Sequence, residues 1–264
     1  AEADVSVVSG LSTTVRLGEV ETVEHNQDRG LGVTVYIGKR KGSASTSDFR
    51  DAAITEIVSA AIGIAKYTAE DEYAGLADAE LMAYDYPDLD LCYPWQLQAE
   101  AAIEIAQTCE AAARGTDSRI NNSEGASVST HHGIRVYGNS HGFIGSYPTS
   151  RHSISCSVIA QEGDSMQRDH WYSIARNPNE LEDVTAIGKC AGERAVRRLG
   201  MRRLATCQAP VIFAADVASS LFGHFIGAIR GESLYRKSTF LLDSLGKQVF
   251  SSLVNVSERP HLAQ

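Results

Sequence analysis

The chain has 264 residues, with 24 Lys and Arg residues against 33 Asp and Glu residues, and 43% of its residues are hydrophobic. This composition is typical of a globular protein, and the length suffices for one large domain or two smaller ones with apolar cores. The formal net charge of −9 argues against a nucleic-acid partner, and no apolar stretch approaches the roughly 20 residues of a membrane-spanning helix.

The first 66 residues are predicted to form an N-terminal α/β domain. Apolar and polar residues alternate over residues 4–42, which indicates a meander of antiparallel strands. Glycines are expected to separate these strands at positions 10, 30 and 38. Ser47 and Asp48 then open a helix, because apolar residues follow at helical spacing from Ile54 to Ala65.

Residues 67–93 are acidic and irregular and are predicted to be a linker. A middle α+β domain is expected over residues 94–204. It begins with an amphipathic helix over residues 98–114 that ends at Gly115. Short strands follow over residues 120–172, with turns expected at Gly133, Gly138, Gly142 and Gly163. A third helix is predicted to open at Asn177-Pro178 and to close at Gly200.

Residues 205–264 are predicted to be the beginning of a C-terminal domain. A short buried strand is expected over residues 208–215, and Asp216 is expected to cap a fourth helix that extends to Ile229. The tail over residues 241–256 is mixed in character. Because strands and helices occur in separate blocks, the predicted fold class is α+β.

The cysteines are scattered along the chain and include no CxxC pair, which indicates free thiols in a reducing compartment. They are Cys92, Cys109, Cys156, Cys190 and Cys207. The first residues, Ala1 to Asp4, lack the basic and apolar regions of a secretory signal. We therefore expect a cytoplasmic protein.

The sequence Gly-Asn-Ser-His-Gly at residues 138–142 matches G-x-S-x-G, the nucleophile elbow of α/β-hydrolases. An elbow joins a strand to a helix, whereas both flanks of this sequence are predicted to be strands. A hairpin turn is therefore the favoured interpretation, and a hydrolase that uses Ser140 is a remote alternative.

Histidines on neighbouring predicted strands could in principle converge on a zinc ion. They are His131, His132, His141 and His152. Alternating strand positions place His131 and His132 on opposite faces, so surface or hydrogen-bonded imidazoles are favoured over a metal site. For the arginines that end the third helix, complementing the helix dipole is favoured over binding an anion. These arginines are Arg194, Arg197, Arg198, Arg202 and Arg203.

The predicted fourth helix carries Ser219, Ser220 and His224 near Asp216. A serine and a histidine can act as nucleophile and base when a third group orients the imidazole. Packing is the favoured interpretation here, because no orienting carboxylate other than Asp216 is evident.

Longer motifs resemble the PmbA (TldE) branch of the bacterial PmbA/TldD family, whose members are also labelled modulators of DNA gyrase. The motifs occupy residues 30–38, 41–48, 122–126, 136–142, 209–213, 221–224 and 235–246. The resemblance implies a cytoplasmic protease system in which a TldD-type subunit and a PmbA-type subunit form a heterodimer. Such a heterodimer would digest unfolded peptides, mature certain peptide antibiotics and remove a labile antitoxin.

In TldD-type chains, the resemblance implies, an H-E-x-x-x-H helix binds zinc and supplies a catalytic Glu. Aligning its final Gly-His on Gly223-His224 places Ser219 at the first metal ligand and Ser220 at the catalytic Glu. Only His224 remains as a remnant of the motif. The resemblance therefore implies no catalytic residue, no metal ligand set and no cofactor in this chain, with zinc in the TldD-type partner.

Relative to this family, the chain is expected to lack an N-terminal helical segment and to stop early in the C-terminal domain. Apolar faces of the fourth helix and of residues 235–245 would then be partly uncovered. The alternative function is a metal-independent peptide-binding or regulatory protein, linked to an antitoxin or to gyrase and possibly homodimeric, which captures peptides at exposed strand edges. A self-contained hydrolase that uses Ser140 or Ser219 is the remaining alternative.

Overall fold

The computed structural model describes residues 1–263, which fall into two compact units. Residues 1–201, with the last described residues 261–263, form the first unit, and residues 202–260 form the second. Within the described chain, no helix is both long and apolar enough to cross a membrane.

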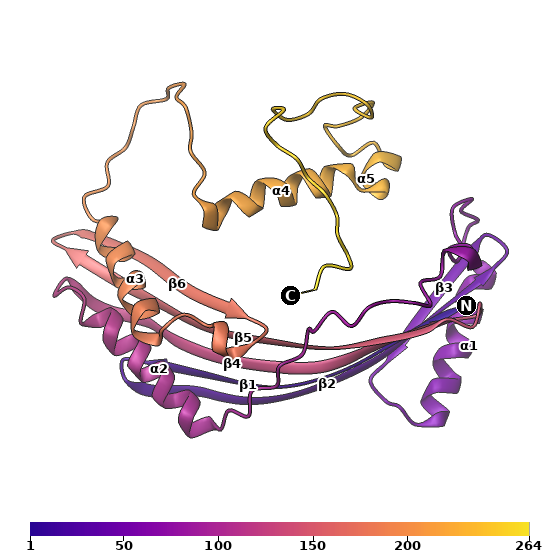
Figure 1. Cartoon of the computed structure of the whole chain (residues 1–264), viewed down its shortest axis with the longest axis horizontal. Helices are drawn as coiled ribbons and strands as arrows, with labels where there is room; N and C mark the ends of the chain where they lie inside the picture. Colours follow the sequence, from indigo (N-terminus) through magenta and orange to yellow (C-terminus); the bar gives the residue numbers. More distant parts are fainter. Residues whose placement is uncertain (264) are drawn as a thin grey trace. The chain divides into compact units, whose positions relative to one another are not determined.

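The first unit is built on one six-stranded sheet with the order β3-β2-β1-β4-β5-β6 (Figure 1). All neighbouring strands are antiparallel. The strands are β1 (Glu2–Arg16), β2 (Glu19–Ile37), β3 (Arg40–Thr46), β4 (Ile120–Asn139), β5 (Ile144–Glu162) and β6 (Ser165–Ala175). Together with the helices they confirm the predicted α+β class. Because β1 pairs with β4, strands from residues 1–66 and from residues 94–204 lie in the same sheet.

The strands are longer than the sequence predicts, because several glycines expected at turns lie inside strands. Gly10 lies within β1, Gly30 within β2, and Gly133 and Gly138 within β4. At two of these positions the backbone of the next strand leaves no room for a side chain. A β-carbon at Gly10 would lie 2.6 Å from the Thr130 carbonyl oxygen, and one at Gly133 would lie 2.4 Å from the Val7 carbonyl oxygen. Turns do occur at Gly38, Gly142 and Gly163, as predicted, each with positive φ.

One face of the sheet carries the helices of this unit. Helix α1 (Asp51–Tyr67) packs on β2 and β3 at one end of the strands. Helices α2 (Ala99–Arg114) and α3 (Val184–Arg197) pack at the other end (Figure 1). The main core lies beneath α2 and α3, and it includes Val15, Val128, Ile154 and Ile187.

Helices α2 and α3 approach each other through small residues. A β-carbon at Gly188 would lie 2.1 Å from the Cys109 carbonyl oxygen, and one at Gly192 would lie 2.7 Å from the Ala113 carbonyl oxygen. The two backbones are therefore in direct contact, which no larger residue at these positions would permit.

Two helices begin later than the sequence predicts. Helix α1 begins at Asp51, whereas the Asp48 carboxylate accepts the N–H of Arg50 in the preceding turn, at 3.0 Å. Asn177 does cap a helix, but it caps the short 3₁₀ helix η2 (Pro178–Glu180). The cap of α3 is Asp183, whose Oδ1 accepts the N–H of Ala186 at 2.9 Å.

The carboxylate of Glu110 fastens α2 to the turn between β1 and β2. Leu17 and Gly18 form this two-residue turn, with φ values of 54° and 84°. Their N–H groups donate to Glu110 Oε1 at 2.8 Å and to Oε2 at 2.7 Å. Glu110 is only 1% exposed. Its charge is thus buried against two donors, which is the arrangement that makes a buried carboxylate tolerable.

The connection between α1 and α2 is irregular, as predicted for residues 67–93, apart from the 3₁₀ helix η1 (Ala79–Leu81). Its final part is fastened to β5. Ser150 Oγ accepts the Tyr93 N–H at 2.7 Å, and the Ser150 N–H donates to the Leu91 carbonyl at 2.9 Å. These contacts place Trp95, a few residues further on, over the helix-bearing face of the sheet.

His152 completes this attachment from β5. Its Nε2 lies 2.8 Å from the Tyr93 carbonyl oxygen, and its Nδ1 lies 2.8 Å from Thr130 Oγ1. Because a carbonyl oxygen only accepts, Nε2 carries the proton and Nδ1 accepts from the Thr130 hydroxyl. His152 is completely buried, and this burial lowers its pKa. The imidazole is therefore held neutral.

The second unit contains α4 (Ala215–Ile229) and the short α5 (Gly231–Tyr235). The predicted buried strand over residues 208–215 is wrong, since Val211 and Ile212 are 72% and 95% exposed and the segment is irregular. Among the described residues it has no neighbouring strand to satisfy its backbone. The predicted cap is also wrong, because Ala214 is at the N-cap and Asp216 lies in the first turn.

The apolar side of α4 is partly uncovered, as expected from the sequence. Its side chains remain between 40% and 42% exposed at Leu221, Phe222, Ile226 and Ile229. Phe225 contacts Phe250 with the ring centroids 5.1 Å apart.

Replacing Glu110 by Gln should destabilise the first unit. The amide nitrogen cannot accept a hydrogen bond, so one N–H of the turn loses its partner inside the protein. The free energy of unfolding should fall by about 1–3 kcal/mol, measured by urea denaturation. Glu104→Gln is the matched control, because Glu104 is exposed on the same helix. Equal stability of the two variants would contradict the role given to Glu110.

Protonation of His152 should destabilise the fold. A lowered folded-state pKa means that the stabilisation is complete above the unfolded-state value of about 6.5 and is lost as the pH falls through the folded-state pKa. The free energy of unfolding of the His152→Gln variant should therefore depend less on pH, between about pH 5 and 7, than that of the unchanged chain. His141→Gln, at an exposed turn position, should keep the original slope, and a shared change in slope would refute the assignment.

Candidate functional site

The positions aligned with the metal-binding motif lie on α4 in the second unit. Ser219, Ser220 and His224 are all exposed. Position 219 is five residues before His224, which separates the two by about 140° around a regular α-helix. Within residues 1–263 no group of three or more His, Cys, Asp or Glu residues is arranged to hold a metal ion. A catalytic zinc needs about three protein ligands, so the residues at these positions do not fit one.

Ser220 lies one turn before His224 and could face it, but its hydroxyl is directed elsewhere. Ser220 Oγ donates to the Val217 carbonyl at 2.7 Å. An activated serine would instead donate to an imidazole nitrogen. The geometry of α4 therefore offers no nucleophile and base pair.

Ser140 lies in the turn between β4 and β5, as predicted. The turn is closed by the Gly142 N–H, which donates to the Asn139 carbonyl at 3.1 Å. Both flanks are strands, whereas a nucleophile elbow needs a helix after the serine. The sequence G-x-S-x-G is here a hairpin turn and nothing more.

The histidines singled out in the sequence do not converge. His131 pairs with Gly10 and His132 with Ser9 in adjacent positions of the β1–β4 ladder, so their side chains point to opposite faces. His141 lies in the hairpin turn, and its Nε2 lies 3.1 Å from the Ala77 carbonyl oxygen. Both nitrogens of His152 are already hydrogen-bonded inside the protein.

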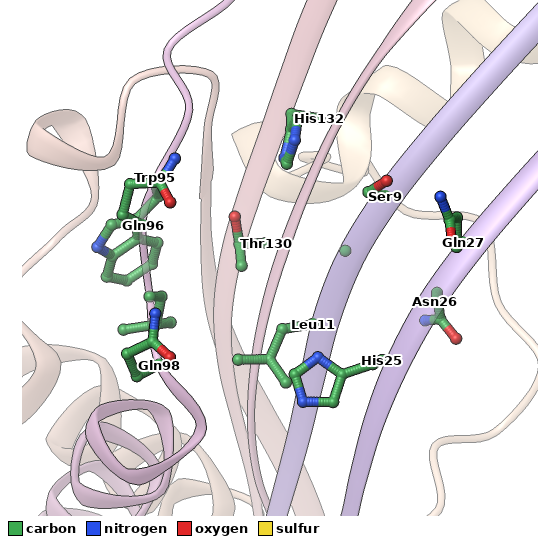
Figure 2. A pocket seen from close by; sticks show the side chains of 12 residues that line it. Ser9, Leu11, His25, Asn26, Gln27, Trp95, Gln96, Gln98, Thr130 and His132 are labelled. Carbon is green, nitrogen blue, oxygen red and sulfur yellow. The ribbon is translucent and has the colours of Figure 1, made fainter.

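A hollow of about 520 Å³ lies on the helix-bearing face of the sheet (Figure 2). Its floor comes from the middles of β2, β1 and β4, and its side comes from the segment that leads into α2. The lining residues are Ser9, Gly10, Leu11, His25, Asn26, Gln27, Trp95, Gln96, Leu97, Gln98, Thr130 and His132. Its volume lies in the range of about 300–1,000 Å³ that is typical of ligand sites.

The hollow exists because of how the sheet is covered and how residues 91–98 are attached. The pairs Leu11–Thr130 and Leu11–His25 place these side chains on the face that packs against α2. Trp95 packs edge-on against the buried His152, with the ring centroids 5.6 Å apart. The indole is thereby held at the side of the hollow.

The hollow is not among the sites predicted from the sequence, although its polar residues carry a signal. Ser9, Gln27 and His132 lie on the same face of the sheet as core residues such as Val15 and Val128. Polar residues at inward positions of a strand indicate either a buried network or a site. They could have been recognised only with the register of β1 against β2 and β4 in hand.

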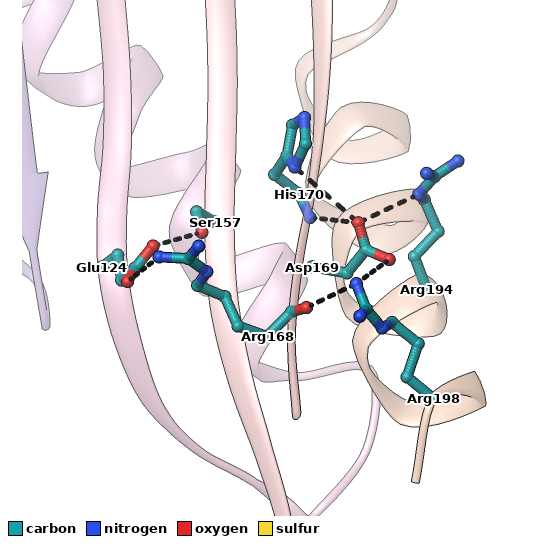
Figure 3. A network of polar contacts seen from close by, with 7 residues as sticks. All are labelled: Glu124, Ser157, Arg168, Asp169, His170, Arg194 and Arg198. Atoms are coloured by element: carbon teal, nitrogen blue, oxygen red, sulfur yellow. Dashed lines mark hydrogen bonds and ion pairs between the residues drawn. The ribbon is translucent and has the colours of Figure 1, made fainter. Parts of the chain in front are cut away.

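Two of the arginines singled out near the end of α3, Arg194 and Arg198, are engaged within the protein (Figure 3). Asp169 on β6 lies 3.4 Å from Arg194 Nε and 3.5 Å from an Arg198 nitrogen. Burial by itself raises the pKa of Asp169, but the His170 N–H and the two guanidinium groups outweigh it and lower that pKa. These cations therefore fasten α3 to β6, and an external anion is not needed to explain them.

Comparisons with known proteins agree with the motifs in the sequence. Models of the PmbA/TldA metallopeptidase match along the chain: domain 1 at residues 1–65, the central domain at residues 92–199 and the C-terminal domain at residues 206–264.

Two curated relatives can be aligned with nearly the whole of this chain. This chain is 50% identical to Metalloprotease PmbA of Escherichia coli O157:H7 over 99% of its length. Over the same share it is 49% identical to a Metalloprotease PmbA homolog of Haemophilus influenzae. In both cases it spans only 58% of the relative.

A candidate modulator of DNA gyrase from Bacteroides thetaiotaomicron has a TM-score of 0.89 at 26% identity, over 99% of this chain and 60% of that one. TldE from Thermococcus kodakarensis has a TM-score of 0.64 at 17% identity, over 92% of this chain and 55% of that one, and so shares the fold. The chain therefore belongs to the PmbA/TldD metallopeptidase family, in its PmbA (TldE) branch.

Proposed function

We propose that this chain acts as the non-metallated subunit of a zinc-dependent peptidase whose catalytic subunit is a TldD-type chain. In this assembly the partner binds the zinc and cleaves unfolded peptides, including precursors of peptide antibiotics. The PmbA-type chain completes the chamber and guides the substrate.

The observation that carries this proposal is the chemistry of α4. The family is a metallopeptidase family, yet the positions aligned with its metal-binding motif present one imidazole and two hydroxyl groups, at His224, Ser219 and Ser220. One imidazole is too few for a catalytic zinc. A chain that retains the family fold without these ligands is best explained as a partner of a chain that has them.

The compartment proposed is the cytoplasm. All five cysteines are free thiols. Unpaired cysteines in this number are typical of a reducing environment, where disulfides do not persist.

The zinc content of the purified chain tests the proposal. After purification without a chelator, elemental analysis should find far less than one zinc per chain. The chain alone should not cleave an unfolded peptide, whereas a mixture with a TldD-type chain should cleave it, and a chelator should abolish the cleavage. Ser219→Ala should leave cleavage by the mixture unchanged, because position 219 lies about 140° around the helix from His224 and has no base beside it.

About one zinc per chain, or chelator-sensitive cleavage by the chain alone, would refute the proposal. Loss of all cleavage in the Ser219→Ala mixture would support a hydrolase that uses Ser219 instead.

A second candidate function is a peptide-binding or regulatory protein that acts without a metal, alone or as a homodimer. The position of β3 at the edge of the sheet favours it, because an edge strand offers unpaired backbone groups to an extended peptide. Peptide binding by the chain without any cleavage by the mixture would support this second function over the first.

A further inference from the structure

The hollow on the helix-bearing face has a lining without formal charge. No Asp, Glu, Lys or Arg contributes to it. Its polar groups are side-chain amides, hydroxyls and imidazoles, supplied by Ser9, His25, Gln27, Gln96, Gln98, Thr130 and His132. Trp95, Leu11 and Leu97 add an apolar part. The lining is therefore mainly polar but uncharged, with one apolar part beside Trp95.

Most of these polar groups are not used by the protein itself. Thr130 is the exception, because its hydroxyl donates to His152. In the described structure the side chains of Gln27, Gln96 and His132 make no hydrogen bond to another protein group, and Figure 2 shows them on three different sides of the hollow. They are therefore free to bond to a ligand.

We propose that this hollow binds an extended, uncharged segment of a peptide. A side-chain amide both donates and accepts, which matches the alternating N–H and C=O groups of a peptide backbone. Small apolar side chains of the peptide would pack on Trp95 and Leu11. A charged side chain would lose water without gaining an opposite charge, so the site discriminates against it.

The dimensions of the hollow agree with this ligand. Its floor spans β2, β1 and β4, and neighbouring strands lie about 4.8 Å apart. The floor is thus about 10 Å wide, which equals roughly three residues of extended peptide at about 3.3 Å each. The inference rests on the proposed function, since it assigns to this chain a place where the substrate is held before it is cleaved.

Fluorescence of Trp95 tests the inference. The chain has two tryptophans, so Trp171→Phe leaves Trp95 as the reporter. The probe is a ten-residue peptide of Gly, Ala, Ser and Val with blocked ends. Its titration into the whole chain should change the Trp95 emission to saturation, and a peptide with Asp and Lys at alternate positions should bind at least threefold more weakly.

Matched variants locate the site. Gln27→Ala and His132→Ala should each weaken binding about three- to tenfold, which corresponds to the loss of one neutral hydrogen bond. Gln161→Ala and His141→Ala, outside the hollow, should leave binding unchanged. If Trp171→Phe fails to fold, hydrogen exchange of residues 24–28 and 130–133 in the unchanged chain replaces fluorescence, and the peptide should slow exchange in both segments.

The inference is overturned if the neutral peptide gives no saturable change, if the control variants weaken binding equally, or if maltohexaose but not the peptide produces the change. Its failure is distinct from that of the proposed function. Cleavage by the mixture with no response at Trp95 would refute peptide binding at the hollow but leave the proposed function standing. A response at Trp95 with no cleavage by the mixture would support binding at the hollow and refute the proposed function.

Discussion

The pairing of β1 with β4 is the constraint on which the rest of the first unit depends. The ladder runs from the Glu2–Asn139 pair to the Val15–Ala126 pair and joins two hairpins that are far apart in the sequence. It brings β2 and β5 to either side of one continuous surface, and it aligns Leu11 with Thr130 and Ser9 with His132. Without this register neither the core beneath α2 nor the hollow beside Trp95 would exist. The glycines at positions 10 and 133 permit the close contact that the ladder requires.

The helices turn this continuous surface into a frame with an open centre. Helix α1 packs at one end of the face, and α2 and α3 pack at the other, so the middle of the strands is left to polar side chains. Rigid attachments surround this centre. Glu110 fixes the turn of the first hairpin, while Ser150 and His152 fix the segment that carries Trp95. A site built on strands and buried hydrogen bonds is better ordered than one built on a free loop.

Sequence patterns were sufficient for the existence of helices α1 to α4 and for the fold class, although not for every helix start. Helix α2 follows from its apolar spacing almost to the residue, because the period of an amphipathic helix is a local property. Strand lengths were not predictable in the same way. Gly10 and Gly133 look like turn residues in the sequence, but their reason for being glycine is a backbone on the neighbouring strand. The prediction of a strand over residues 208–215 failed for the opposite reason. Apolar residues indicate a strand, but none of the described residues forms a neighbouring strand for this segment.

The candidate sites also divide into those that depend on one element and those that depend on how several elements pack together. The loss of the zinc motif at Ser219 and Ser220 can be read directly from the sequence, because it concerns residues on one helix. The hollow cannot, because its members come from β1, β2, β4 and the segment before α2, and only the register brings them together. Asp169 is a further example, since its two arginines follow it by 25 or more positions and meet it only when α3 packs on β6.

The exposed connection between α1 and α2 contributes little to holding the first unit together. Residues 68–78 are almost entirely exposed and carry no strand or helix, whereas β1 and β4 on either side of them share a full ladder. The peptide bonds of this connection therefore do not hold the two halves together. The sheet could be assembled from two separate polypeptides divided there. Joining them in a single chain mainly raises the effective concentration of each half for the other. A cut in this stretch would change the number of chains without changing the fold.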